Sequence, residues 1–125
     1  MTEDGGIELD PAPVKPVVPF SPLEALDVRL GTIEGVDDVP DSTKLVALRV
    51  SFGDHRRTIL AGLKKEREDP AALVGVQALF VVNLEPRRMA GMVSEGMLFD
   101  IGDADGLPPA LATPEHPLPA GARAG

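Results

Sequence analysis

Residues 83–97 read NLEPRRMAGMVSEGM and connect two apolar runs, residues 78–82 before them and residues 96–99 after them. The two runs have the character of buried strands, so the stretch between them is a loop with fixed ends. This loop carries adjacent cations, Arg87 and Arg88, behind a proline and ahead of a glycine that predicts a turn. Binding groups are commonly found on loops held by a rigid scaffold. The stretch therefore predicts a cationic binding loop between two strands.

Outward from this loop, alternating or continuous apolar residues predict five short strands, at residues 27–36, 45–52, 57–61, 76–82 and 96–101. Asp69-Pro70 predicts the start of a short helix between the third and fourth strands, and Gly75 predicts its end. Gly31 in the first strand predicts a bend or a close backbone approach. An all-β, five-stranded barrel with a short helix between strands 3 and 4 has the order of an OB-fold, which supports oligonucleotide binding.

Both ends of the chain are predicted to extend beyond the barrel. Residues 1–19 combine prolines, glycines and acids, so we expect a flexible Pro-rich arm before a domain spanning residues 20–125. Ser21, Pro22 and Glu24 predict a short helix with Ser21 as its N-cap in a capping box. One face of this helix is apolar and is formed by Phe20, Leu23 and Leu26. The barrel has little surface left to cover that face, so we expect a homodimer that buries it.

Three segments in this order resemble one known family. They are DVRLGTIEGVDDVPDSTKLVALRVSFG at residues 27–53, RTILAGL at residues 57–63, and the loop at residues 83–97. Together they resemble the tRNA-binding domain found at the ends of some methionyl-tRNA synthetases, in the bacterial phenylalanyl-tRNA synthetase β chain, in the EMAP II cytokine, and as stand-alone dimers. The resemblance covers residues 20–122 and implies a tRNA-binding OB-fold with a C-terminal extension, dimeric when it stands alone.

The resemblance implies a ligand face built mainly from cations. Arginine suits such a face because its guanidinium group clamps phosphates in bidentate geometry and stacks on bases. The expected tRNA contacts are Lys44, Lys64, Lys65, Arg67, Asn83, Arg87, Arg88, Ser94, Glu95 and Met97.

Four of these residues have an alternative role inside the fold. The amide of Asn83 suits a base edge and the closing of a strand end equally well. Ser94 and Glu95 match the family's Ser-x-Gly-Met element, where they meet exposed bases, but both also suit hydrogen bonds at a strand start. Met97 is more typical of a core than of a ligand contact.

Charge is distributed unevenly along the chain. The net charge is −8, yet residues 1–42 carry −8, residues 43–94 carry +4 and residues 95–125 carry −4. Phosphate binding requires lysine and arginine, and the segment that contains most of the expected contacts is the basic one. A basic patch within an acidic shell is one interpretation, and a solvated mixed-charge surface is the other.

Several function classes are disfavoured by the sequence. The chain has no cysteine, so disulfides and thiolate zinc sites are excluded. His55 and His116 lack a nucleophile at useful spacing, and no phosphate-loop or dinucleotide motif is present. We therefore expect a non-catalytic protein without a cofactor or metal. Without a span of ~20 apolar residues or a basic N-terminal signal, we expect a cytoplasmic protein that does not enter a membrane.

Three functions remain open at this point. The first is tRNA binding by shape and phosphate contacts, in trans or alongside an aminoacyl-tRNA synthetase. The second is a secretion chaperone that binds unfolded polypeptides, because the Arg-Arg-Met-Ala-Gly segment also resembles that of the CsaA proteins, whereas residues 94–97 resemble the tRNA binders more. The third is a purely structural subunit that has lost its RNA site. The chain has no Trp or Tyr, so any stacking on bases must come from Phe or Arg.

Overall fold

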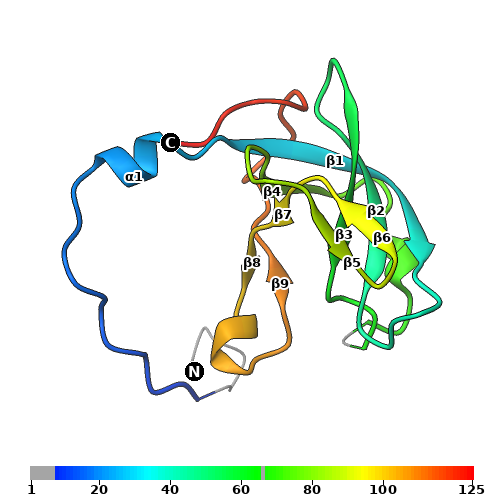
Figure 1. Cartoon of the computed structure of the whole chain (residues 1–125), viewed down its shortest axis with the longest axis horizontal. Helices are drawn as coiled ribbons and strands as arrows, with labels where there is room; N and C mark the ends of the chain where they lie inside the picture. Colours follow the sequence, from blue (N-terminus) through cyan, green and yellow to red (C-terminus); the bar gives the residue numbers. More distant parts are fainter. Residues whose placement is uncertain (1–7, 66) are drawn as a thin grey trace.

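The computed structural model describes residues 8–65 and 67–125, and it shows a nearly closed antiparallel barrel (Figure 1). The barrel sheet has the strand order β3-β2-β1-β4-β7. Its strands are β1 (Val28–Asp38), β2 (Val46–Ser51), β3 (Arg56–Ala61), β4 (Gln77–Val81) and β7 (Met97–Leu98). This architecture confirms the predicted OB-like barrel.

The alternation read from the sequence places the core. Val46, Leu48, Val50 and Phe52 all point inward and are at most 3% exposed. They join a single interior cluster with residues of β1, β3 and β4, in which Phe80 is fully buried. Alternating apolar residues form one face of a strand, so the same pattern that predicts β2 also builds the barrel interior.

Two irregularities let the long strand β1 curve around the barrel. A Cβ at Gly31 would lie 2.4 Å from Val50 Cγ1, which confirms the predicted close approach at this glycine. The pairing of β1 with β2 shifts register between Ile33 and Gly35. A bulge of this kind bends a strand and increases its twist. As a result β1 pairs with β2 through one half and with β4 through the other.

The helix between strands 3 and 4 is a single 3-10 turn, η1 (Pro70–Leu73). Gly75 follows it with a φ of +91°, as expected for a helix stop. The predicted last strand, residues 96–101, is divided into β7 and β8 (Asp100–Ile101). β8 leaves the barrel and pairs with β9 (Ala110–Leu111), and the turn η2 (Asp103–Asp105) lies between them.

The two chain ends differ in how they attach to the barrel. Residues 8–19 are exposed and form no helix or strand, whereas residues 1–7 lie outside the described part of the chain. The C-terminal segment, drawn in red in Figure 1, lies along β1. Leu30 N donates to Ala122 O at 2.8 Å, and Gly121 N donates to Leu30 O at 2.7 Å. Main-chain pairing therefore fixes this Pro-rich tail to the barrel.

The short N-terminal helix α1 (Ser21–Glu24) is present, but its predicted cap is wrong. Phe20 occupies the N-cap position and no side chain caps the helix. Ser21 lies inside the first turn, so its hydroxyl is not at the position from which a cap accepts the free N–H groups. The apolar residues of this segment are exposed, at 68% for Phe20, 60% for Leu23 and 44% for Leu26. No helix in the described residues is long and apolar enough to cross a membrane.

Candidate nucleic-acid interface

The loop at residues 83–97 contains a small hairpin that sequence reasoning did not predict. Its strands are β5 (Arg87–Met89) and β6 (Met92–Ser94). The turn has φ values of +49° at Ala90 and +81° at Gly91. Two positive φ values in a two-residue turn match the twist of the flanking strands, and the glycine adopts one of them without strain. The predicted turn at Gly91 is thus confirmed.

The hairpin is packed on the outside of the barrel. Ala47 and Leu60 are paired across β2 and β3, on the face opposite to the interior, and both are buried. They form a second apolar cluster with Val39, and Met89 and Met92 of the hairpin pack against it. Burial of the two methionines on one face holds the hairpin against β2 and β3.

At the C-terminal end of the hairpin, the side chains of Ser94 and Glu95 bind the free edge of β3 and close the barrel there. Ser94 is only 4% exposed, and its Oγ accepts from Leu60 N at 2.9 Å while donating to Gly96 O at 3.0 Å. Glu95 Oε1 accepts from Thr58 N at 3.0 Å, and Glu95 N donates to Thr58 O at 2.9 Å. The two residues thus satisfy an edge of β3 that would otherwise be unpaired. Both residues therefore have the alternative role considered in the sequence analysis, which is hydrogen bonding at a strand start.

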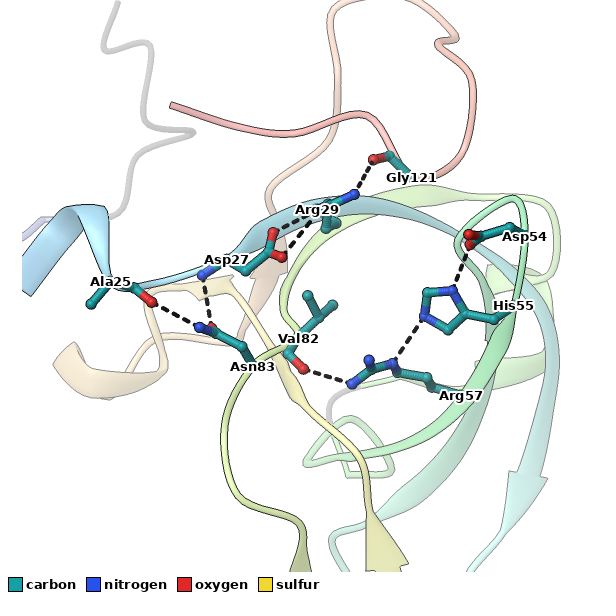
Figure 2. Close-up of polar contacts among 9 residues, drawn as sticks. All are labelled: Ala25, Asp27, Arg29, Asp54, His55, Arg57, Val82, Asn83 and Gly121. Carbon is teal, nitrogen blue, oxygen red and sulfur yellow. Dashed lines mark hydrogen bonds and ion pairs between the residues drawn. The ribbon is translucent and has the colours of Figure 1, made fainter.

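A neighbouring arginine secures the same connection. Arg57 Nη1 donates to Val82 O at 2.6 Å (Figure 2). It also donates to Glu95 O at 3.1 Å, so it joins both ends of the loop. Its Nε donates to His55 Nε2 at 3.1 Å, and His55 Nδ1 lies 2.7 Å from Asp54 Oδ1. That contact with His55 lowers the pKa of the Asp54 carboxyl below its usual value. Sequence reasoning missed Arg57, although it lies in the RTILAGL segment.

Asn83 is also used within the fold. Its Oδ1 accepts from Asp27 N at 2.7 Å, and its Nδ2 donates to Ala25 O at 2.7 Å (Figure 2). The amide thereby ties the end of β4 to the linker between α1 and β1. Asp27 in turn binds Arg29 in bidentate geometry, with distances of 2.6 and 3.1 Å, and Arg29 Nη1 donates to Gly121 O. The hydrogen bond from Arg29 lowers the pKa of Asp27, and the same bond raises the pKa of Arg29.

Two of the expected tRNA-binding cations contact their own chain. Lys64 Nζ lies 2.6 Å from Asp38 Oδ1 and donates to the carbonyls of Val39 and Ser42. These contacts fix the turn between β1 and β2. Arg67 is half-buried, and its Nη2 donates to Pro109 O at 3.2 Å.

The other four expected tRNA-binding cations are exposed to solvent, namely Lys44, Lys65, Arg87 and Arg88. Among the described residues, none of their side chains is in a hydrogen bond or ion pair. Arg87 lies opposite buried Ser94, and Arg88 lies opposite exposed Val93. Side chains alternate along a strand, so the two arginines leave opposite faces of the hairpin.

Met97 is 46% exposed, so the structure places it at the surface and not in the core. Within the described part of the chain, no group of three or more His, Cys, Asp or Glu residues is arranged to hold a metal ion.

Comparison with known proteins identifies the family that this chain matches. A model of the putative tRNA binding domain matches residues 28–123. The methionine–tRNA ligase of Methanothrix thermoacetophila is 43% identical over 110 residues, which are 86% of this chain and 15% of the ligase. That of Phocaeicola vulgatus is 41% identical over 95 residues, 75% of this chain and 14% of the ligase. The chain thus spans only a small part of the curated relatives that it matches.

Solved structures show the same fold over most of the chain. A MetRS-related protein from Pyrococcus horikoshii has a TM-score of 0.80 at 29% identity, over 89% of this chain and 100% of that one. The chaperone CsaA from Bacillus anthracis has a TM-score of 0.74 at 29% identity, over 88% of this chain and 100% of that one. A barrel of this kind with an attached cationic hairpin defines an OB-like binding domain. The family match is specific within that class, and the chain belongs to the putative tRNA-binding domain family.

The closure along β3 leads to a stability prediction. Ser94→Ala leaves the buried Leu60 N–H without its acceptor, so we expect the free energy of unfolding to fall by about 1–3 kcal/mol. Urea denaturation followed by circular dichroism measures this loss. Ser51→Ala is the matched control, because Ser51 Oγ only accepts a longer bond, 3.3 Å from the exposed Gly53 N. We expect that change to stay within about 0.5 kcal/mol. Equal losses in the two variants would contradict the proposed closure.

Proposed function

We propose that this protein binds tRNA non-catalytically, with the β5–β6 hairpin as the main contact. The observation that carries the proposal is the contrast between Arg87 and Arg88 and the other expected contacts. Asn83, Ser94, Glu95 and Lys64 are occupied inside the fold, whereas both hairpin arginines are exposed and have no partner among the described residues. Guanidinium groups held apart on a packed hairpin suit phosphates of a folded RNA.

The same arrangement favours recognition by shape over recognition by sequence. Phosphate contacts fix the register of a nucleic acid but carry no sequence information. Lys44 and Lys65 lie exposed on the loops that precede β2 and follow β3, and they extend the cationic surface beyond the hairpin. We infer a domain that adds tRNA affinity, either in trans or alongside an aminoacyl-tRNA synthetase, in the cytoplasm.

The proposal predicts that Arg87→Ala and Arg88→Ala each weaken binding to all tRNAs alike. Each lost phosphate contact should reduce the slope of log affinity against log salt concentration by roughly 0.7–0.9. Filter binding of bulk tRNA at several salt concentrations measures both effects. Arg56→Ala is the control, because Arg56 is 72% exposed but already pairs with Glu34 at 2.6 Å. A double Arg87→Ala, Arg88→Ala variant that binds tRNA like the parent would rule out the hairpin as the site.

We further propose that the protein is a homodimer through α1. Phe20, Leu23 and Leu26 are large apolar side chains exposed on one short segment, and clustered exposure of this kind marks interaction surfaces. The C-terminal residues Arg123–Gly125 line a hollow of about 840 Å³ beside these side chains, so a partner there would contact both chain ends.

The dimer proposal predicts that Leu23→Asp yields monomers, because a carboxylate cannot be buried at an apolar interface without a partner. Sedimentation equilibrium at micromolar concentration measures the mass. Val74→Asp is the matched control, since Val74 is 52% exposed but lies at the end of η1. A parent protein that sediments at 13.1 kDa would contradict the proposal.

A chaperone function is the second candidate, and the likeness to the chaperone CsaA from Bacillus anthracis favours it. Salt separates the two functions in the same experiments. Affinity for tRNA falls by orders of magnitude between about 50 and 200 mM salt if six or more phosphates are bound. Apolar capture of a polypeptide is insensitive to screening. An unfolded test protein kept soluble in high salt, with no salt-dependent binding of tRNA, would favour the chaperone.

A further inference from the structure

Beside the hairpin lies a pocket that the sequence did not predict, although two of its lining residues, Lys44 and Met97, are expected tRNA contacts. It has a volume of about 390 Å³, within the range of small-ligand sites, which begins near 300 Å³. Its apolar lining includes Leu60, Met89, Met97 and Leu98. Met89 belongs to the hairpin strand that carries both arginines, so the pocket adjoins that strand.

The polar groups of the pocket are of two kinds and come from different elements. Lys44 contributes an ammonium group from the turn before β2, whereas Asp100 and Asp103 contribute carboxylates from β8 and η2. Among the described residues, no ion pair or side-chain hydrogen bond involves any of these three charged groups. They are therefore free to contact a ligand, and a suitable ligand has both a negative group and hydrogen-bond donors.

The apolar lining suits a flat aromatic ring. The thioethers of Met89 and Met97 are polarizable, and sulfur makes favourable contacts with aromatic rings. Phe52 and Phe80 are buried in the barrel, so they offer no stacking surface here. Methionine thus provides what aromatic residues usually provide for an unpaired base.

We infer that this pocket binds one unstacked nucleotide of the bound tRNA, with its phosphate toward Lys44 and an amino-bearing base edge toward Asp100 and Asp103. The inference rests on the proposed tRNA binding. Carboxylates accept hydrogen bonds from the exocyclic amine of cytosine or adenine, whereas uracil and hypoxanthine present a carbonyl at the equivalent position. The pocket therefore selects amino-bearing bases, although the hairpin itself is indifferent to sequence.

Mononucleotides test this directly, because CMP and UMP differ only in the exocyclic group at C4 and in the hydrogen on the adjacent N3, and AMP and IMP differ in the same way at C6 and N1. We expect titration of the full chain to shift the NMR signals of the Met89 and Met97 methyl groups. The methyl of Met92, which belongs to the same hairpin but does not line the pocket, is the internal control. CMP should bind about five-fold or more tightly than UMP, and AMP than IMP, since a matched base contact gives that discrimination.

Variants test whether the two carboxylates cause the preference for CMP over UMP. Asp100→Ala with Asp103→Ala should remove the CMP-over-UMP ratio, and the ratio is unaffected by any general change in phosphate repulsion. Asp105→Ala is the control, because Asp105 is exposed in the same turn but does not line the pocket. Equal affinity for CMP and UMP in the parent would overturn the inference. So would a Leu-rich hexapeptide that shifts the Met97 methyl more strongly than CMP does.

The outcome is separable from that of the proposed function. Arg87→Ala with Arg88→Ala should weaken tRNA binding but leave the CMP-induced shifts unchanged. If tRNA binds through the arginines while CMP shifts neither Met89 nor Met97, the pocket inference alone fails. If CMP binds as expected while tRNA does not bind at all, the proposed function fails instead.

Discussion

The arrangement of this domain depends on how the free edge of β3 is satisfied. Two side chains of the hairpin exit, Ser94 and Glu95, accept the amide protons of Leu60 and Thr58. Gly96 follows directly, and a Cβ at this position would lie 2.9 Å from Val81 O. The close approach lets the chain pass from β6 along β3 into β7 and complete the barrel. The same residues end the hairpin. The contacts that close the barrel therefore also position the hairpin that carries Arg87 and Arg88.

As a result, the polar residues near the hairpin form two groups, those with partners inside the fold and those exposed to solvent. Asn83, Ser94, Glu95, Arg57 and Lys64 hold the loops, and they leave the hairpin arginines as cations without internal partners in the described part of the chain. The net charge of −8 repels nucleic acid at long range. An exposed cationic hairpin on such a protein favours one orientation of approach, because complementary charge sets register and suppresses wrong encounters.

The sequence predicted the barrel, but it did not show which polar side chains form hydrogen bonds inside the fold. Alternation over β2 and the close approach at Gly31 were readable because they depend on periodicity and the lack of a side chain. The internal contacts of Asn83 and Lys64 could not be predicted. A donor or acceptor in the sequence shows what can be bound but not which groups lie within hydrogen-bonding distance in the fold. The β5–β6 hairpin was missed because its strands have three residues each, too few to show a period. The C-terminal pairing with β1 uses main-chain groups that leave no sequence pattern.

A double-mutant cycle on tRNA affinity tests the link between closure and binding most directly. Ser94→Ala is combined with the Arg87→Ala, Arg88→Ala pair, and tRNA binding is measured at one salt concentration where all variants are folded. The account predicts that Ser94→Ala weakens tRNA binding in the parent but has almost no effect once the arginines are absent, with a coupling of about 1 kcal/mol or more. An equal loss in both backgrounds, or no loss in the parent, would show that the closure of β3 does not position the binding arginines.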